Sequence, residues 1–136
     1  MTIKVTCAII EQFGRVLVTQ RSSFMTQPLL WEFPGGKLEE GEAEEEGLRR
    51  EIMEELNLRI TPILRLTPVT QDYGDKTVEL IPYISEYNQG AIHLTEHHTY
   101  HWAHPEDLPG YTWCAADLPI VEEYLAYLNT KPESQV

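Results

Sequence analysis

Residues 34–58 read PGGKLEEGEAEEEGLRREIMEELNL, and their charge shapes the interpretation of the whole chain. The stretch holds nine of the 22 acidic residues of the sequence, which are Glu39, Glu40, Glu42, Glu44, Glu45, Glu46, Glu51, Glu54 and Glu55. Only Lys37, Arg49 and Arg50 offset them. Such a run is either a solvated helical face or a surface that binds a doubly charged cation.

The composition restricts the class of protein. A chain of 136 residues has the size of one domain. We expect a single domain over residues 1–130 and a flexible C-terminal tail over residues 131–136. The net charge of −12 argues against binding to a nucleic acid duplex, which requires a basic surface. A small nucleotide remains compatible, because a divalent cation supplies positive charge locally.

Nothing in the sequence indicates a membrane protein. No apolar run is long enough to span a bilayer, and the N-terminal residues alternate more than a signal peptide does. We therefore expect a cytoplasmic protein. Two cysteines, Cys7 and Cys114, make no disulfide framework, and the apolar surroundings of Cys7 indicate a buried, reduced thiol.

Several segments are predicted to be strands or extended pieces, and some of them alternate between apolar and polar residues. They are residues 2–10, 15–21, 31–36, 59–69, 77–87 and the second part of 91–104. Pro82 indicates that its strand is an edge strand or contains a bulge, because proline cannot donate to a ladder. With two helices added, this order of elements predicts an α/β fold in which helices cover a mixed sheet.

Two segments are predicted to be helices. Residues 43–56 place apolar side chains at near-helical spacing among strong helix formers, and Asn57 suits the left-handed conformation that ends many helices. Residues 117–128 carry a second apolar stripe, with Asp117 as the expected N-cap and Pro119 in the first turn. The stripes are Ala43, Leu48, Ile52 and Leu56 in the first helix and Leu118, Val121, Leu125 and Leu128 in the second.

Three carboxylates share one face of the first helix. Glu51, Glu54 and Glu55 are spaced i, i+3 and i+4, where like charges repel by a few tenths of a kcal/mol per pair. No basic residue follows between Glu51 and Asn57 to relieve them. Hard cations such as Mg²⁺ bind through one or two carboxylates together with substrate phosphates. The cluster therefore predicts a metal platform, although glutamate is also simply a good helix former on an exposed face.

The neighbouring residues favour the metal platform. Gly35 and Gly36 permit a backbone turn that aims a carbonyl at a cation or amides at an anion. Glu42 lies near the helix start, where the helix dipole favours a negative charge. Arg50 lies beside the cluster, where it is able to pair with a carboxylate and fix its rotamer.

This stretch resembles the Nudix box, G-x5-E-x7-R-E-U-x-E-E-x-G-U, in which U is apolar. The residues in register are Gly36, Glu42, Arg50, Glu51, Ile52, Glu54, Glu55 and Leu58. Asn57 departs from the pattern, because it replaces the last glycine. The segments VLVTQR, WEFPGGKLEEGE and WCAADLPIVEEYL extend the resemblance, over about residues 3–128, to the MutT-like branch of oxidised-guanine and CTP-type nucleotide pyrophosphohydrolases.

The resemblance implies a fold and a reaction. The fold is an α/β/α sandwich with a mixed sheet between helices. The reaction is the hydrolysis of a (deoxy)nucleoside triphosphate to monophosphate and pyrophosphate with Mg²⁺ or Mn²⁺, which sanitises the nucleotide pool and serves DNA repair. The implied metal ligands are Glu51, Glu54, Glu55 and the Gly35 carbonyl. Glu96, from a later loop, is implied as a further ligand or as the base, and Arg50 belongs to the catalytic set.

The resemblance also assigns substrate contacts. Arg21 is expected at a phosphate, although a plain surface arginine is the alternative. Gly36 and Lys37 are assigned to substrate binding, and the nucleotide cleft is expected to be lined by Tyr73, Asp75, Lys76 and Leu80. Asp117 is expected to read the base edge. An ionised aspartate accepts from the amine of cytosine or from the donors of guanine, so both bases remain open.

Two further groups have more than one interpretation. Trp31, Phe33, Tyr73 and Trp113 either stack on a base or belong to the core. The histidines His93, His97, His98, His101 and His104 form a local cluster, but their spacing gives little support to a zinc site, and a solvated or edge-strand role is favoured.

Alternatives to the predicted activity also remain. They are hydrolysis of another nucleoside diphosphate derivative, such as a nucleotide sugar or a dinucleoside polyphosphate, and a catalytically idle nucleotide-binding module. The sequence predicts a small-molecule nucleotide as the partner and leaves the oligomeric state open.

Overall fold

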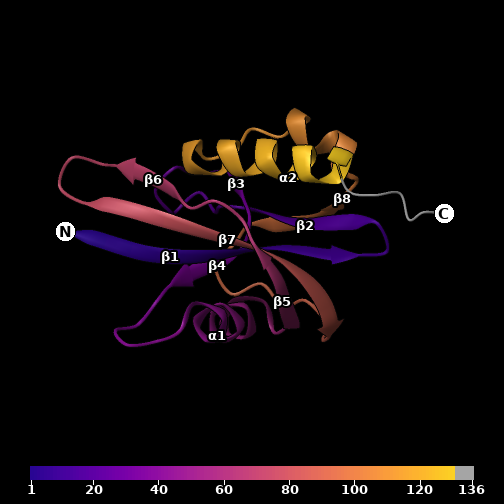
Figure 1. The fold of residues 1–136 in the computed structure, drawn as a ribbon, viewed down its shortest axis with the longest axis horizontal. Coiled ribbons are helices and arrows are strands. Elements are labelled where there is room, and N and C mark those ends of the chain that lie inside the picture. The colour runs from indigo at the N-terminus through magenta and orange to yellow at the C-terminus, as the bar shows by residue number, and fades with distance from the viewer. Residues whose placement is uncertain (131–136) are drawn as a thin grey trace.

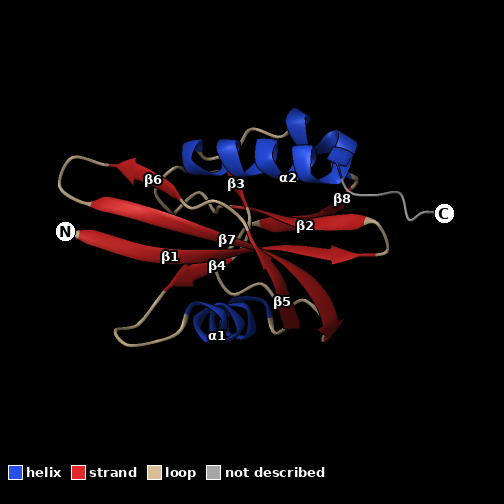
Figure 2. Cartoon of the chain, viewed as in Figure 1, coloured by secondary structure: helices blue, strands red, loops and turns tan. Residues whose placement is uncertain are grey.

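The computed structural model describes residues 1–130, so the tail expected over residues 131–136 lies outside the described residues. A mixed sheet forms the middle layer, and one helix packs on each of its faces (Figure 1, Figure 2). Helix α1 (Glu44–Leu56) lies below the sheet in these views, and helix α2 (Leu118–Thr130) lies above it. The predicted α/β/α sandwich is confirmed.

The strands follow the predicted segments with small differences in length. They are β1 (Thr2–Gln12), β2 (Arg15–Gln20), β3 (Trp31–Glu32), β4 (Gly35–Lys37), β5 (Arg59–Arg65), β6 (Val69–Asp72), β7 (Thr77–Gln89) and β8 (Thr99–Ala103). Two short 3-10 helices, η1 (Pro105–Gly110) and η2 (Ala115–Asp117), precede α2. The predicted segment 59–69 is divided between β5 and the start of β6.

The sheet opens between two of its strands, and this opening positions the functional residues. Strand β1 runs parallel to β7, and the other named pairs are antiparallel. Strands β1 and β2 pair only at their hairpin end, at Glu11↔Val16 and Gln12↔Arg15. Beyond this point they separate, and β3 pairs with β2 while β4 pairs with β1. Residues 31–37 therefore pass through the opening.

Two hydrophobic clusters, one on each face of the sheet, form the core. Successive side chains of β1 alternate between them, because side chains along a strand point to opposite faces. Cys7 and Ile9 belong to the cluster under α2, whereas Ala8 and Ile10 belong to the cluster over α1. The prediction that Cys7 is a buried thiol is confirmed, since both cysteines are buried and free.

Helix α1 matches its prediction closely. It begins at Glu44, one residue later than expected, with Ala43 at the N-cap position. Leu48, Ile52 and Leu56 are fully buried against the sheet. Asn57 ends the helix with φ 62°, so the predicted left-handed exit is confirmed.

No helix within residues 1–130 is long and apolar enough to cross a membrane.

The start of helix α2 differs from its prediction. The turn of η2 runs directly into α2, so Asp117 lies inside a helical turn and its carboxylate turns inward instead of capping the helix. The N-cap prediction is therefore wrong. Most of the predicted apolar stripe faces the core, because Val121 is buried and Leu125 and Leu128 pack against the core cluster. Leu118 is instead 48% exposed, and Ile120 and Tyr124 are the further buried residues of this face.

Strand β7 is central, so the prediction that Pro82 marks an edge strand is wrong. The strand pairs with β1 on one side and with β5 and β6 on the other. Pro82 lies between Leu80, the last residue paired with β6, and Tyr83, the first paired with β5. The antiparallel ladder is interrupted there, which is where a strand tolerates a residue without an N–H.

Candidate active site

A cleft of about 390 Å³ occupies the opening of the sheet. It is bordered by β1, by the segment from β3 to β4, by one face of α1 and by the loop between β7 and β8. Its acidic lining residues fall into two groups. We call Glu51, Glu55 and Glu96 the carboxylate end. We call Glu32 and Asp117, together with the Cys114 thiol within 4.8 Å of their carboxylate oxygens, the buried end.

The carboxylate end brings together residues from the helix and from the later loop. Glu51 and Glu55 come from successive turns of α1, and Glu96 comes from the loop between β7 and β8. Burial raises the pKa of Glu51. Burial also raises the pKa of Glu55, and the negative charge of Glu96 raises it further. These carboxylates therefore repel one another across the cleft, and a cation between them would relieve that repulsion.

The two glycines are required by close packing beside the carboxylates. A Cβ on Gly36 would overlap the carboxylate of Glu51, and a Cβ on Gly35 would overlap the backbone of Thr6 and Cys7. The two glycines thus allow the backbone of β4 to lie directly against the Glu51 side chain. An all-oxygen set of carboxylates and backbone carbonyls fits a hard divalent cation such as Mg²⁺ or Mn²⁺.

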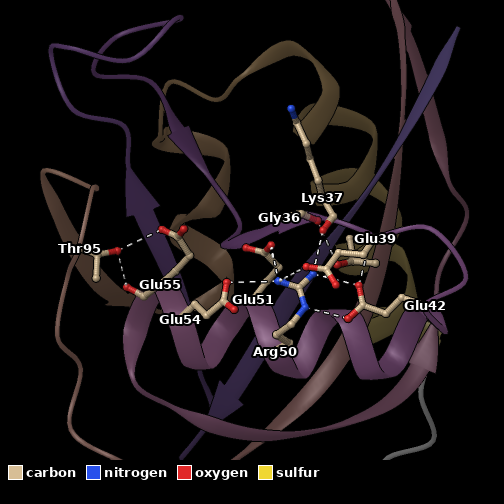
Figure 3. A network of polar contacts seen from close by, with 10 residues as sticks. Gly36, Lys37, Glu39, Glu42, Arg50, Glu51, Glu54, Glu55 and Thr95 are labelled. Carbon is tan, nitrogen blue, oxygen red and sulfur yellow. Dashed lines mark hydrogen bonds and ion pairs between the residues drawn. The ribbon is translucent and has the colours of Figure 1, made fainter.

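Arg50 is the positive centre that orders the carboxylate end (Figure 3). Its Nε donates to Glu42 Oε2 at 2.7 Å, and its Nη1 donates to Glu51 Oε2 at 3.0 Å and to Glu54 Oε1 at 3.2 Å. Its Nη2 also donates to the Lys37 carbonyl at 3.1 Å. The hydrogen bond from Arg50 lowers the pKa of Glu42 to about 2. The predicted pairing of Arg50 with a carboxylate is thus present in the structure.

The three box glutamates do not have equivalent surroundings. Glu54 is 58% exposed at its side chain, does not line the cleft and contacts Arg50. Glu55 lies on the other side of Glu54, where Thr95 Oγ1 donates to its carboxylate at 3.3 Å and to its backbone carbonyl at 3.2 Å (Figure 3). Metal ligation by Glu54 remains a prediction, and it requires the Glu54 side chain to turn toward the cleft.

The predicted phosphate and cleft residues are only partly brought together. Arg21, Lys37 and Leu80 line the cleft. Arg21 already donates to Glu32 at 3.0 Å, so it is not a free surface arginine. Tyr73, Asp75 and Lys76 lie in the exposed turn between β6 and β7, outside the cleft lining. Their contact with substrate remains a prediction.

The buried end is organised by two carboxylates. Asp117 is 3% exposed, and its Oδ2 accepts a hydrogen bond from the Phe33 N–H at 3.0 Å. Burial raises the pKa of Asp117 to about 8 in spite of this bond, and the nearby charge of Glu32 adds to the effect. Asp117 is therefore mostly neutral at pH 7. Burial likewise raises the pKa of the Cys114 thiol to about 12.

Glu32 is the acceptor that ties this end together. Arg21 Nη1 lies 3.0 Å from its Oε1, and His97 Nε2 lies 2.8 Å from its Oε2. Cys114 Sγ is 4.0 Å from Oε1. Sequence reasoning missed Glu32, His97 and Cys114 as site residues. The sequence carries no local signal for Glu32, because its contacts with His97 and Cys114 join segments far apart along the chain.

The histidines His97 and His101 make separate contacts. His97 contacts Glu32, whereas His101 Nδ1 lies 3.1 Å from the Tyr111 hydroxyl and its ring packs on Trp31. Among residues 1–130, the metal-type donors within 4.8 Å of one another are those of Glu32, Cys114 and Asp117, without a histidine.

The aromatic residues are mainly structural. Phe33 and Trp113 are buried in the core, with ring centroids 4.9 Å apart, and Phe33 also borders the cleft. Trp31 packs on His101, and Tyr73 is 43% exposed in the β6–β7 turn. The core interpretation therefore holds for Phe33 and Trp113, and of the four aromatics only Phe33 is placed to touch a base.

Comparisons with known proteins agree with this geometry. The NUDIX domain family matches residues 1–124. A CTP pyrophosphohydrolase of Escherichia coli (strain K12) is 32% identical over 130 residues, which cover 96% of each chain. An 8-oxo-dGTP diphosphatase of Proteus vulgaris is 36% identical over 72 residues, which cover 53% of this chain and 64% of that protein.

Solved structures show the same relationship. The solution structure of the E. coli ORF135 protein superposes with a TM-score of 0.84 at 30% identity, covering 97% of this chain and 94% of that chain. The crystal structure of a MutT protein from Methanosarcina mazei Go1 gives a TM-score of 0.84 at 28% identity, covering 96% of each chain. The chain therefore belongs to the Nudix hydrolase family.

Proposed function

We propose that the protein hydrolyses a cytosine-type nucleoside triphosphate to the monophosphate and pyrophosphate, with Mg²⁺ or Mn²⁺ as the cofactor. One observation carries the proposal: a single cleft has a cluster of partly exposed carboxylates at one end and a neutral, buried Asp117 at the other. The first end suits a cation and phosphates, and the second suits an uncharged base.

The carboxylate end provides the cation site. We assign Glu51, Glu54, Glu55 and the Gly35 carbonyl to the cation, which when bound supplies phosphate neutralisation and an activated water. Glu96 is exposed beside Glu55 and is assigned as a further ligand or as the acceptor of the proton from that water. Arg50 fixes the rotamer of Glu51 through the 3.0 Å contact.

The phosphates and the rest of the nucleotide contact residues between the two ends. We assign Gly36 and Lys37 to the phosphates, because both line the cleft beside Glu51. Arg21 is assigned to the substrate as a lining residue already oriented by Glu32. Leu80 borders the same cleft, and Tyr73 and Lys76 would join the site if the turn between β6 and β7 approaches a bound nucleotide.

The protonation state of Asp117 favours a particular pairing edge. A neutral carboxylic acid has one donor and one free acceptor, whereas an ionised one only accepts. Cytosine offers an amine donor next to a ring-nitrogen acceptor, so the neutral acid satisfies both positions. Guanine offers two adjacent donors and matches the ionised form instead. The raised pKa of Asp117 thus supports cytosine over guanine.

The relatives support hydrolysis of a nucleoside triphosphate, and the one that matches 96% of the chain supports the cytosine assignment. The relative that covers nearly the whole chain is named a CTP pyrophosphohydrolase, and the shorter match is named an 8-oxo-dGTP diphosphatase. A role in removing modified nucleotides, and hence in DNA repair, is part of the proposal. So is a cytoplasmic location, because two free thiols suit a reducing compartment.

The test is a turnover panel with Mg²⁺ that scores pyrophosphate and orthophosphate separately. It contains the common nucleotides, 5-substituted dCTPs, 8-oxo-dGTP, nucleotide sugars and dinucleoside polyphosphates. We expect pyrophosphate from CTP or a cytosine analogue at the highest kcat/KM. Preference for 8-oxo-dGTP would contradict the cytosine assignment, turnover of sugars or dinucleotides alone would contradict the triphosphate assignment, and no metal-dependent turnover would contradict the proposed activity.

A further inference from the structure

The loop between β7 and β8 is anchored on the helix that carries the carboxylate end. The His93 N–H donates to the Leu56 carbonyl at 3.0 Å, at the last turn of α1. Thr95 Oγ1 donates to both the backbone carbonyl and the carboxylate of Glu55. The loop is thus attached to the turn of the helix that presents Glu55 to the cleft.

The same loop is also anchored at its other end, through His97 and His98. The His98 N–H donates to the Gln20 carbonyl at 2.8 Å, which fixes the loop on β2. The His97 ring reaches Glu32 at 2.8 Å. Glu96 lies between these two attachments and borders the cleft. A segment of four residues, 95–98, therefore connects the two ends of the cleft.

The His97 side chain is held at an energetic cost. It is 4% exposed, and within residues 1–130 its Nδ1 is buried without a hydrogen-bond partner. Because Nε2 faces a carboxylate, we place the proton on Nε2, which leaves Nδ1 as a bare acceptor. An apolar residue of similar size would avoid this unsatisfied group. Compared with such an apolar residue, the histidine therefore provides one additional interaction, which is the contact with Glu32.

We infer that His97 is a positioning residue that couples base binding at the buried end to cation binding at the carboxylate end. The carboxylate oxygens of Glu32 and Asp117 lie within 4.8 Å of each other, so a base held beside Asp117 also packs on Glu32 and tightens its 2.8 Å contact with His97. The adjoining peptide then fixes Glu96 beside Glu55, where the cation is expected. This inference rests on the proposed function, because it requires both ligands. The coupling must be reciprocal, so each ligand strengthens the binding of the other by the same factor.

Calorimetric titration measures this coupling without turnover. Mn²⁺ is titrated into the metal-free protein with and without saturating cytidine, which has no phosphate and so cannot contact the cation through one. We expect cytidine to lower the Kd of Mn²⁺ by about 5-fold, at the low end of typical coupling. In His97→Leu both ligands still bind, but the factor falls to about 1. His97→Gln retains an N–H donor and most of the coupling.

Two more variants separate coupling from folding. Thr95→Val removes the side-chain contact between the loop and Glu55 at an exposed position, while the His93 N–H still holds the loop on Leu56. It therefore tests the same connection even if His97→Leu does not fold. His101→Leu is the matched control, because His101 contacts Trp31 and Tyr111 and no residue of the carboxylate end. We expect loss of coupling in Thr95→Val and the wild-type factor in His101→Leu.

The outcomes distinguish this inference from the function on which it rests. A factor of 1 in the wild type overturns the coupling and leaves the proposed function intact. An unchanged factor in His97→Leu, or in Thr95→Val if His97→Leu does not fold, does the same. Failure of the wild type to bind Mn²⁺ contradicts the cation site itself. Failure to bind cytidine contradicts the base site, and either failure removes the coupling with it.

Discussion

The two ends of the cleft differ in what surrounds their carboxylates. At the carboxylate end, burial raises the pKa of Glu51 and Glu55, but Arg50 donates to Glu51 and Thr95 donates to Glu55, and both contacts oppose that rise. At the buried end, Asp117 is 3% exposed, and burial raises its pKa to about 8. One end gathers carboxylates that a cation would bridge, whereas at the other end the raised pKa of Asp117 favours its protonated form beside the Arg21–Glu32 ion pair.

Under the proposed function, this difference would let one acidic protein bind the two chemically different halves of a nucleotide. Phosphates require positive charge, and a chain of net charge −12 provides it through a cation held by carboxylates. A base requires directed hydrogen bonds. Burial favours the protonated form of Asp117, and this acid offers both a donor and an acceptor. The comparison is open to test, because the two ends are predicted to respond to different changes.

The largest expected effect is at the carboxylate end. Glu55→Gln keeps the shape of the side chain but removes a charged ligand, and we expect kcat for CTP to fall by about 100-fold or more. Steady-state kinetics at saturating Mg²⁺ measures this. Glu45→Gln is the matched control, because Glu45 is exposed on the same helix and does not line the cleft. Near-wild-type turnover of Glu55→Gln would contradict the assignment of Glu55 to the cation site.

The next effect is at the buried end, where the shape and polarity of Asp117 matter more than its charge. Asp117→Ala is expected to lower kcat/KM for CTP by about 10- to 100-fold, since a paired base contact contributes roughly 1–3 kcal/mol. Asp117→Asn offers a donor and an acceptor at all pH values and is expected to stay within about 3-fold of wild type, a factor worth less than 1 kcal/mol. Equal losses in the two variants would contradict the neutral-acid interpretation.

Cation binding in the absence of substrate distinguishes the roles of the two ends. Mn²⁺ at about 100 times its Kd is expected to stabilise the folded protein by about 2.7 kcal/mol, because it binds only the native state. Thermal unfolding with and without Mn²⁺ measures the shift in Tm. We expect a smaller shift in Glu55→Gln and the wild-type shift in Asp117→Asn. A reduced shift in Asp117→Asn would mean that the cation binds at the buried end instead.

The smallest effect is expected where the sequence departs from the box. Asn57 adopts φ 62°, a conformation that glycine reaches without strain, and its side chain donates to the Ala91 carbonyl at 3.3 Å. Asn57→Gly removes the backbone strain but also loses the side-chain hydrogen bond to Ala91. The two effects nearly cancel, so we expect the free energy of unfolding to change by less than about 0.5 kcal/mol. Turnover should be unchanged, and a large loss would show that the helix exit positions the carboxylate end.

The two ends also differ in how well the sequence predicts them. Glu51 and Glu55 lie on one helix, where spacing alone determines the shared face, and Gly35 and Gly36 precede them within the same motif. Asn57 was likewise predicted correctly, because its conformation depends on local backbone preference. These features are local, so they follow from local rules.

The buried end depends on contacts between distant segments. Glu32, His97 and Cys114 come from β3, a loop and the residue before η2, and no spacing rule connects them. His97 was grouped with four other histidines because only the folded structure separates its contact with Glu32 from the contact of His101 with Tyr111. The sequence marked Asp117 as important but did not predict its burial, which determines its protonation state.

The most direct test of the central claim is the affinity of the metal-free protein for CMP between pH 7 and pH 9. The CMP phosphate is already almost fully ionised across this range, since its second pKa is about 6. The raised pKa of Asp117, about 8, makes the acid neutral below that pH and ionised above it. We predict that affinity falls by about 10-fold from pH 7 to pH 9 in the wild type and stays constant in Asp117→Asn. An affinity that is constant or rises with pH in the wild type would show that Asp117 reads the base as an ionised carboxylate, and would contradict the account.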